Sequence, residues 1–252
     1  MKNKILAIIP ARGGSKGVKN KNVQLLGGIP LICHSINFCE KIKISFLVTT
    51  DSDKVWKSIE PYFKRNVKFS DIGLDKIEEL SKGRFIHRRV GFEAKDESLI
   101  SDLLFKLSKQ EELVEYEYFL LLQPTSPLRA ASDLDAIVSL ATQGVDWSSI
   151  FSGREVGGNH PNRMYRIIDD LHAVQLDGFK SQDNIPRQQL EKIFIKDGAY
   201  YFFKKENLRN RIFIGETPVL YQRSLVPPIN IDTEFDLFIA RTYWSDIHEN
   251  HS

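Results

Sequence analysis

The sequence predicts an α/β fold built on a mostly parallel, doubly wound sheet. Over residues 1–145, short apolar runs alternate with stretches whose apolar residues recur at helical spacing. Residues 118–123 form one continuous apolar run, which suits the centre of a parallel sheet because such strands are buried on both faces. Regular alternation of strands and helices is typical of a sheet covered by helices on both sides.

Each expected element has a local signal. Clusters of apolar and β-branched residues predict strands at 4–9, 44–50 and 118–123. Helical periodicity predicts helices over 30–39, around 55–59 and over 98–107. A further helix is expected to begin at Ser132, which forms a capping-box pattern with Asp135. Residues 60–95 are the most polar part of the chain, and we expect surface elements around a loop there.

The pattern changes after Phe151. A hairpin is expected from strands at 164–168 and 172–176, joined by the two-residue acidic turn Asp169–Asp170. Further short strands are expected at 199–203 and 211–215. We therefore expect a single domain over residues 1–252 in which residues 153–215 form a small, antiparallel, β-rich insertion. A final helix is expected from Thr233, which forms a second capping box with Asp236.

Composition excludes several classes of protein. The 252 residues include 35 basic and 33 acidic side chains, a net charge of +2, which argues against a nucleic-acid partner. The longest apolar runs are far shorter than the ~20 residues of a membrane span, so no membrane partner is expected. Cys33 and Cys39 lie on different faces of a predicted helix. We expect free thiols rather than a disulfide or a metal site, which suits a cytoplasmic protein.

The strongest chemical signal follows the first predicted strand, at the strand end where open α/β sheets bind ligands. It consists of Ala11, Arg12, Gly13, Gly14, Ser15, Lys16 and Gly17, followed by Lys19, Lys21 and Asn22. Glycines let the backbone turn its N–H groups toward an anion, and the cations would neutralise a polyphosphate. The spacing matches neither the Walker loop of kinases nor the dinucleotide fingerprint. The alternative interpretation is a basic, glycine-containing surface turn.

Two more segments carry polar side chains that could bind a ligand. Residues 123–129 leave the central strand with two prolines, and the Gln123 amide can both donate to and accept from a sugar hydroxyl. Asn230 and Asp232 share one face of an extended segment before the last helix, where the carboxylate could bind Mg²⁺ beside substrate phosphates. The alternative interpretation of residues 123–129 is a rigid connection between a strand and a helix. The alternative for Asn230 and Asp232 is that their segment only caps the last helix.

Taken together, these segments resemble a known family. IPARGGSKG, LLLQPTSPLR, RQQL ahead of DGAYYF, and NIDTEFDL, in that order, resemble the acylneuraminate cytidylyltransferases, or CMP-sialic acid synthetases. The family includes enzymes for legionaminic and pseudaminic acids. The resemblance implies a three-layer, Rossmann-like nucleotidyltransferase fold whose insertion mediates homodimer formation. It also implies transfer of CMP from CTP to the anomeric hydroxyl of a nonulosonic acid, with release of pyrophosphate, for lipopolysaccharide, capsule or other surface glycan biosynthesis.

The resemblance also implies roles for individual residues. In the CTP-phosphate loop, Arg12, Ser15, Lys16 and Lys21 match, with backbone contacts at Ala11, Gly13 and Gly14. Asn22 matches a cytosine-side contact, and Arg89 resembles a nucleotide-contacting arginine. Gln123 matches a sugar contact, while Arg163 and Arg187 resemble residues that reach the sugar carboxylate across the dimer. Asp232 would hold Mg²⁺, for which Mn²⁺ could substitute. The catalytic set is then Arg12, Lys16, Lys21 and Asp232.

Two positions depart from the family pattern. Asn230 stands where the family has the first aspartate of its DIDT metal motif, and it offers an oxygen but no charge. Asp96 or Asp236 could then assist Asp232 in holding the metal. Asp197 replaces an asparagine, and the added charge could change sugar recognition.

Two alternative functions stay open. They are a CMP-Kdo-type or other sugar nucleotidyltransferase, and a catalytically inactive CTP-binding module. We expect no histidine base, and His34 is expected on a helix surface.

Overall fold

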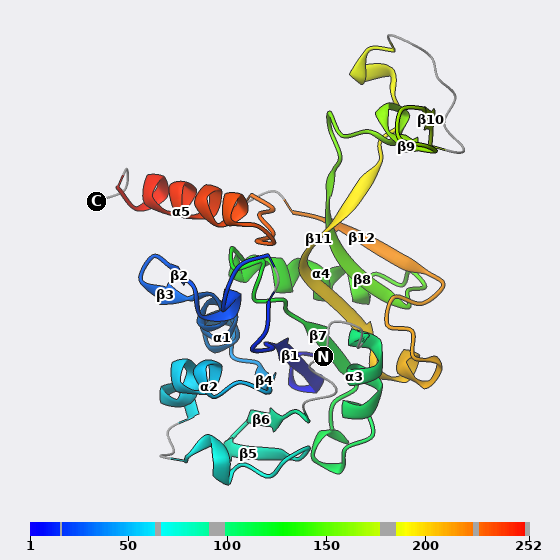
Figure 1. The fold of residues 1–252 in the computed structure, drawn as a ribbon. Helices are drawn as coiled ribbons and strands as arrows, with labels where there is room; N and C mark the ends of the chain where they lie inside the picture. Colours follow the sequence, from blue (N-terminus) through cyan, green and yellow to red (C-terminus); the bar gives the residue numbers. More distant parts are fainter. Residues whose placement is uncertain (16, 64–66, 91–98, 177–184, 224–226, 250–252) are drawn as a thin grey trace.

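The central element is a mixed eight-stranded sheet with strand order β12-β8-β11-β7-β1-β4-β6-β5 (Figure 1). The computed structural model describes residues 1–15, 17–63, 67–90, 99–176, 185–223 and 227–249. Its sheet strands are β1 Ile5–Pro10, β4 Ser45–Thr50, β5 Ile77–Ser81, β6 Arg84–Arg88, β7 Tyr118–Leu121, β8 Ser149–Glu155, β11 Phe194–Lys204 and β12 Pro218–Gln222. The helices are α1 Leu31–Ile42, α2 Asp53–Ile59, α3 Ile100–Leu107, α4 Ala131–Thr142 and α5 Glu234–Glu249.

The centre of the sheet is parallel. Strand β1 pairs in parallel with β4 on one side and β7 on the other, and β4 pairs in parallel with β6. Residues Ile5 to Ile9 of β1 are all buried, as expected for a strand covered on both faces. The predicted central strand at 118–123 is confirmed as β7.

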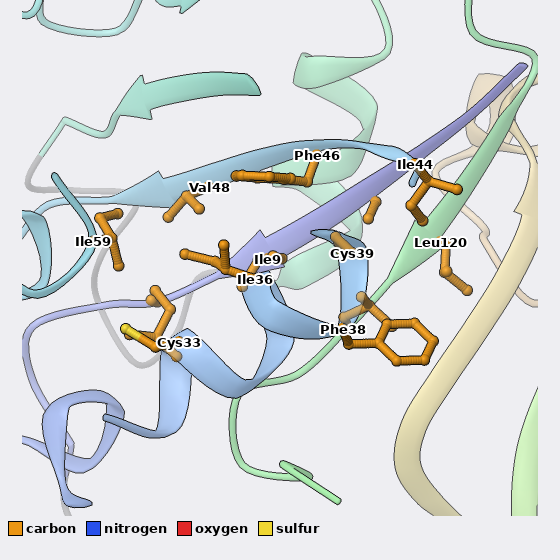
Figure 2. Packing of buried hydrophobic residues seen from close by; sticks show 14 of the residues in the cluster. Ile9, Cys33, Ile36, Phe38, Cys39, Ile44, Phe46, Val48, Ile59 and Leu120 are labelled. Carbon is orange, nitrogen blue, oxygen red and sulfur yellow. The ribbon is translucent and has the colours of Figure 1, made fainter. Parts of the chain in front are cut away.

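Helices cover both faces of this sheet, so the predicted three-layer α/β fold is confirmed. On one face, α1, α2 and α4 pack against Ile5, Ala7 and Ile9 of β1. Figure 2 shows side chains of α1, among them Ile36 and Cys39, directed onto the strands. On the other face, α3 packs against Leu6 and Ile8. None of the helices in the described ranges is both long and apolar enough to cross a membrane.

Both cysteines belong to the core of the first face. Cys33 and Cys39 are free thiols, as predicted, and both are buried among the apolar side chains of this one core (Figure 2). Burial raises the pKa of the Cys33 thiol to about 11, and it raises the pKa of Cys39 as well. A thiol that stays protonated is a weak nucleophile, so both residues act as small apolar groups.

Two expectations for the first half of the chain were wrong. Residues 60–95 contain two sheet strands, β5 and β6, which pair as an antiparallel hairpin beside β4. Helix α4 begins at Ala131 and is capped by Asp133, whose Oδ2 accepts from the Ala130 N–H at 3.0 Å. Asp135 instead forms an ion pair with Lys2 at 2.5 Å.

The second half of the chain contributes more to the central sheet than its sequence suggests. Strands β8, β11 and β12 extend the sheet beyond β7, so residues 194–204 of the predicted insertion are sheet and not insertion. The predicted strand at 211–215 is absent, because Gly215 has a φ of +72° and turns the chain toward β12.

What projects from the body is the hairpin of β9 Tyr165–Ile167 and β10 Ala173–Gln175, together with the chain that carries it (Figure 1). We call residues 156–176 and 185–193 the arm. The hairpin was predicted correctly, but its turn spans Asp169, Asp170 and Leu171, because Ile168 and His172 still pair at 3.0 Å.

Helix α5 packs at the opposite side of the molecule, against the short hairpin of β2 Leu25–Leu26 and β3 Ile29–Pro30 (Figure 1). A Cβ atom at Gly27 would lie 2.0 Å from Nε1 of Trp244, so the hairpin turn touches the helix directly. His34 is also buried here, with its ring 5.0 Å from that of Trp244 and its Nε2 3.0 Å from the Leu26 carbonyl. The prediction of a surface histidine was wrong, because α5 covers this side of α1.

Candidate active site

The carboxyl ends of the parallel strands share one edge of the sheet, and the predicted site segments lie there. From β1 the chain continues through α1 to β4 on one side, and from β7 it continues through α4 to β8 on the other side. In open α/β sheets this arrangement forms a crevice that binds ligands. The segments following β4 and β6 border the same edge.

The loop after β1 is held by its neighbours in a conformation that needs glycine. The Gly13 N–H donates to Oδ1 of Asp51 at 2.8 Å, and a Cβ atom at Gly13 would lie 2.9 Å from Cβ of Ser52. Asn22 is buried, and its amide donates to the Arg12 carbonyl at 2.9 Å. Arg12, Gly13, Asn22 and Ser52 line a small hollow at this point. Gly14 and Ser15 lie beside it in the same loop, and Lys16 lies outside the described residues.

The same loop passes directly over the NIDT segment. A Cβ atom at Gly17 would lie 2.1 Å from the Asp232 carbonyl oxygen. Four residues further along the chain, Nζ of Lys21 donates to Oδ1 of Asp232 at 2.9 Å. The Lys21 side chain is 14% exposed and that of Asp232 is 62% exposed, so the cation is sheltered while the carboxylate faces outward. The structure therefore joins the predicted phosphate loop to the predicted metal carboxylate.

The close approach at Gly17 makes a testable prediction about stability. Gly17→Ala should destabilise the fold by about 1–3 kcal/mol, because the added methyl group forces the loop away from the Asp232 backbone. Gly14→Ala is the matched control, since a Cβ atom there meets nothing within 4 Å. Urea unfolding of both variants measures the difference. Equal stability of the two variants would contradict the close packing of loop and segment.

A third apolar cluster explains why these segments meet. It combines Val18 from the phosphate loop, Leu128 from the loop after β7 and Ile231 from the NIDT segment, all buried. The other buried members are Leu237 and Ala240 of α5, Leu26 of β2 and Leu31 of α1. Burial of one apolar residue from each motif holds the three polar segments against one another.

Asp236 acts as a cap for α5. Its Oδ2 accepts from the Thr233 N–H at 2.8 Å, from the Thr233 hydroxyl at 2.8 Å and from the Asp232 N–H at 3.0 Å. Burial by itself would raise the pKa of Asp236, but these hydrogen bonds stabilise the ionised carboxylate and lower its pKa below the usual value. The predicted capping box is confirmed, and the hypothesis that Asp236 assists the metal loses support because Oδ2 is engaged. Asp96 lies outside the described residues.

Gln123 lies at the start of the loop after β7, beside a tight turn of β11. Gly198 has a φ of +76°, and a Cβ atom there would lie 2.8 Å from Oε1 of Gln123 and 3.0 Å from Oγ of Ser126. Arg129 anchors the loop by donating to the carbonyls of Gln123 at 2.8 Å and Ala199 at 3.1 Å. Burial lowers the pKa of Arg129 to about 10.

Asp197 does not add a free charge to the sugar side. Its Oδ2 lies 3.4 Å from Nη1 of Arg223, and its Oδ1 accepts from the Ser152 hydroxyl and from the Ala199 N–H at 3.0 Å. Both partners of the ion pair are almost fully buried. The charge that replaces the family asparagine is therefore compensated inside the fold.

Arg223 is the cation of a buried polar network that the sequence does not predict. It also lies 3.9 Å from Asp133 and donates to the Leu128 carbonyl at 2.6 Å. Asp133 in turn accepts from the hydroxyls of Tyr200 and Tyr221, each at 2.7 Å. This buried network ties α4, β11 and β12 to the loop after β7. No local pattern around these residues predicts it, because its members are far apart in the sequence.

Arg89 is part of the framework at the end of β6. It is buried, and its Nε and Nη2 donate to Oγ1 and the carbonyl of Thr49 at 2.9 and 3.0 Å. The same Thr49 hydroxyl contacts Nδ1 of His87 at 2.9 Å, and Nε2 of His87 lies 3.3 Å from Asp75. Arg89 thus borders the predicted nucleotide site while bracing β4 and β6.

The structure does not bring Arg163 and Arg187 to Gln123 within one chain. Arg163 is exposed in a 3₁₀ turn, Pro161–Arg163, on the arm, and the backbone of Arg187 begins a second such turn. The side chain of Arg187 lies outside what the structure describes. Figure 1 shows the arm well separated from the edge of the sheet that carries Gln123.

Comparisons with known proteins agree with this arrangement. A family model described as "Cytidylyltransferase" matches residues 6–71. N-acylneuraminate cytidylyltransferase of Escherichia coli O18:K1:H7 is 28% identical, covering 96% of this chain and 52% of that protein. CMP-N,N'-diacetyllegionaminic acid synthase of Legionella pneumophila is 29% identical, covering 92% of this chain and 93% of that protein. The chain spans about half the length of the N-acylneuraminate cytidylyltransferase and nearly all of the legionaminic acid synthase.

Solved structures share the fold at low identity. CMP:2-keto-3-deoxy-manno-octonic acid synthetase complexed with CTP superimposes with a TM-score of 0.64 at 14% identity, covering 97% of this chain and 100% of that one. The synthase of 4-diphosphocytidyl-2C-methyl-D-erythritol from Anaerococcus prevotii gives a TM-score of 0.59 at 13% identity, covering 96% and 99%. This chain is therefore similar in sequence to N-acylneuraminate cytidylyltransferases over most of its own length, and it shares the fold of solved cytidylyltransferases.

Proposed function

We propose that the protein transfers CMP from CTP to the anomeric hydroxyl of a nonulosonic acid and releases pyrophosphate. The observation that carries this proposal is the contact of the glycine-rich loop with Asp232, which places cations and one outward-facing carboxylate at a single edge of the sheet. The relatives named above act, by their names, on sugar acids of this kind. The product would be an activated sugar made in the cytoplasm, where CTP is supplied, for lipopolysaccharide, capsule or another surface glycan.

In this reaction the anomeric hydroxyl loses its proton to Asp232 or to water, its oxygen attacks the α-phosphorus of CTP, and the bond to pyrophosphate breaks. The chemistry depends on charge neutralisation more than on covalent help from the protein. We assign the phosphates to the loop N–H groups from Ala11 to Ser15 and to Arg12, Lys16 and Lys21. Lys21 is already sheltered beside Asp232, so it needs no large rearrangement to contact a phosphate at this position.

The residues present fit a single-carboxylate Mg²⁺ site. Among the described residues, no three or more histidine, cysteine or carboxylate side chains cluster into a closed cation site. Asp232 is exposed beside the phosphate loop, and Mg²⁺ is commonly held by one or two carboxylates together with substrate phosphates. When bound, Mg²⁺ or Mn²⁺ would add positive charge at the α-phosphate and lower the pKa of the attacking hydroxyl.

We further propose a homodimer in which the arm carries Arg163 and Arg187 to the sugar site of a second copy. The arm exposes apolar side chains that a free surface would not favour, such as Ile167 at 73% and Leu171 at 90%. A guanidinium group suits the two oxygens of a sugar carboxylate. Sedimentation should show a dimer, and Ile167→Asp with Leu171→Asp should give a monomer with a raised KM for the sugar acid. A monomeric wild-type protein would contradict this assignment.

The reaction is tested by following pyrophosphate release from CTP and Mg²⁺ with a panel of sialic, legionaminic and pseudaminic acids, and Kdo. Release with a nonulosonic acid supports the proposal, and release with Kdo alone would replace the substrate class. CTP binding without release, with either Mg²⁺ or Mn²⁺, would identify an inactive nucleotide-binding module. Competition with UTP and dTTP measures the nucleotide specificity.

A further inference from the structure

Asp232 is held from two sides by groups that donate hydrogen bonds. Its Oδ1 accepts from the Lys21 ammonium group at 2.9 Å, and its Oδ2 accepts from the amide nitrogen of Asn230 at 2.6 Å. An ionised carboxylate can only accept hydrogen bonds, so the nitrogen end of the Asn230 amide must face it. The amide oxygen therefore points the other way, toward Oγ of Ser126 at 3.3 Å.

The surroundings of Asn230 favour this one orientation. The backbone beside it is fixed, because the Ile231 N–H donates to the Thr125 carbonyl at 2.7 Å and the Ile231 side chain is fully buried. Ser126 is 1% exposed, and its single hydroxyl proton is shared between the Asp197 carbonyl at 3.0 Å and the Asn230 amide oxygen at 3.3 Å. The amide oxygen also lies beside Gly198, where a Cβ atom would be in ordinary van der Waals contact with it at 3.5 Å.

We propose that Asn230, given the function proposed above, is a positioning residue for Asp232 and not a ligand of the divalent cation. Ligation through the Asn230 oxygen next to Asp232 would require the amide to flip. The flip would remove the hydrogen bond to the carboxylate and set two oxygens against each other. The Lys21 ammonium group already balances the charge of the Asp232 carboxylate. A second carboxylate in place of Asn230 would add a negative charge that only a metal could balance. The cation therefore binds together with CTP, whose phosphates complete a coordination that Asp232 begins.

A nucleotide-free experiment tests the first consequence. Electron paramagnetic resonance measures Mn²⁺ binding to the wild-type protein and to Asn230→Asp without CTP. Asn230→Asp should bind Mn²⁺ at least about tenfold more tightly, because a second carboxylate then faces Asp232. No gain in Asn230→Asp, or tight wild-type binding that Asn230→Ala removes, would overturn the proposal.

A second experiment separates positioning from ligation. Calorimetry gives the factor by which Mn²⁺ tightens CTP binding, measured without sugar. Asn230→Ala should keep this factor within about threefold of the wild-type value while kcat falls about tenfold or more, whereas Asp232→Ala should lose the factor. Loss of the factor in Asn230→Ala to the level of Asp232→Ala would make Asn230 a ligand and overturn the proposal. Thermal unfolding verifies that the variants fold, and Asn230→Ser replaces Asn230→Ala if that variant does not.

The two hypotheses fail in different ways. If the wild-type protein binds no CTP, the proposed function fails, while the nucleotide-free Mn²⁺ comparison of the wild-type protein with Asn230→Asp and Asn230→Ala still tests whether Asn230 is a ligand. If CTP binds and is turned over but Asn230→Ala behaves like Asp232→Ala in calorimetry, only the positioning role fails.

Discussion

Asp232→Ala should lower turnover by about a thousandfold or more while CTP still binds. The exposed Asp232 carboxylate contacts Lys21, and the Asp232 backbone carbonyl lies against Gly17 of the phosphate loop. This carboxylate is therefore the group best placed to hold a cation between protein and phosphates. Binding should persist because the loop backbone and Lys21 are intact in the variant. Pyrophosphate release measures kcat, and calorimetry measures the nucleotide affinity.

Glu234→Gln is the matched control for this variant. Glu234 is an exposed carboxylate at the start of α5, two positions along the chain, so its loss should leave kcat within about twofold of the wild-type value. If Asp232→Ala kept turnover within about tenfold of the wild-type value, Asp232 could not be the principal metal carboxylate.

Arg223→Met should destabilise the fold by about 3–5 kcal/mol, because it leaves two buried carboxylates without their cation. Asp133 and Asp197 are both essentially unexposed, and Arg223 lies 3.9 and 3.4 Å from them. The variant also loses the hydrogen bond to the Leu128 carbonyl at 2.6 Å, which anchors the loop after β7. The free energy of unfolding in urea measures the effect.

Arg211→Met provides the control. Arg211 forms an ion pair with Asp102 at 3.1 Å, but both side chains are about half exposed, so its loss should cost less than about 1 kcal/mol. Asp197→Asn should fall between the two variants, because Arg223 keeps Asp133 as a partner. Equal losses for Arg223→Met and Arg211→Met would show that the buried pair does not stabilise the fold.

The strands with continuous apolar runs could be predicted from the sequence, whereas the more polar sheet strands β5 and β6 could not. Residues 118–123 and 44–50 are continuous apolar runs, and they became β7 and β4. Strands β5 and β6 were missed because each combines only two buried apolar residues with charged neighbours. Their stability comes from pairing, since β6 pairs with β4 and β5 pairs with β6. In α4, Ser132 and Asp133 both suit a helix start, and contacts with Tyr200 and Tyr221 favour Asp133.

Much of the candidate site could also be predicted. Arg12, Gly13, Lys21, Asn22, Gln123 and Asp232 all lie at the predicted edge of the sheet, because the carboxyl ends of parallel strands meet there. The sequence could not show that Arg163 lies on an arm away from this edge. Nor could it show that Arg89 braces Thr49, since that contact joins residues 40 positions apart.

By itself, the sequence determined the chemical groups of the site and the strand ends that present them. Only the tertiary structure decided how those groups are paired. Lys21 and Asp232 are 211 positions apart, and they meet because Val18, Leu128 and Ile231 are buried in one apolar cluster. The same packing turns the Asn230 amide toward Asp232 and pairs Asp197 with Arg223. Hydrogen bonds and ion pairs act over a few ångströms, so the roles of these polar residues follow from the packing of distant apolar ones.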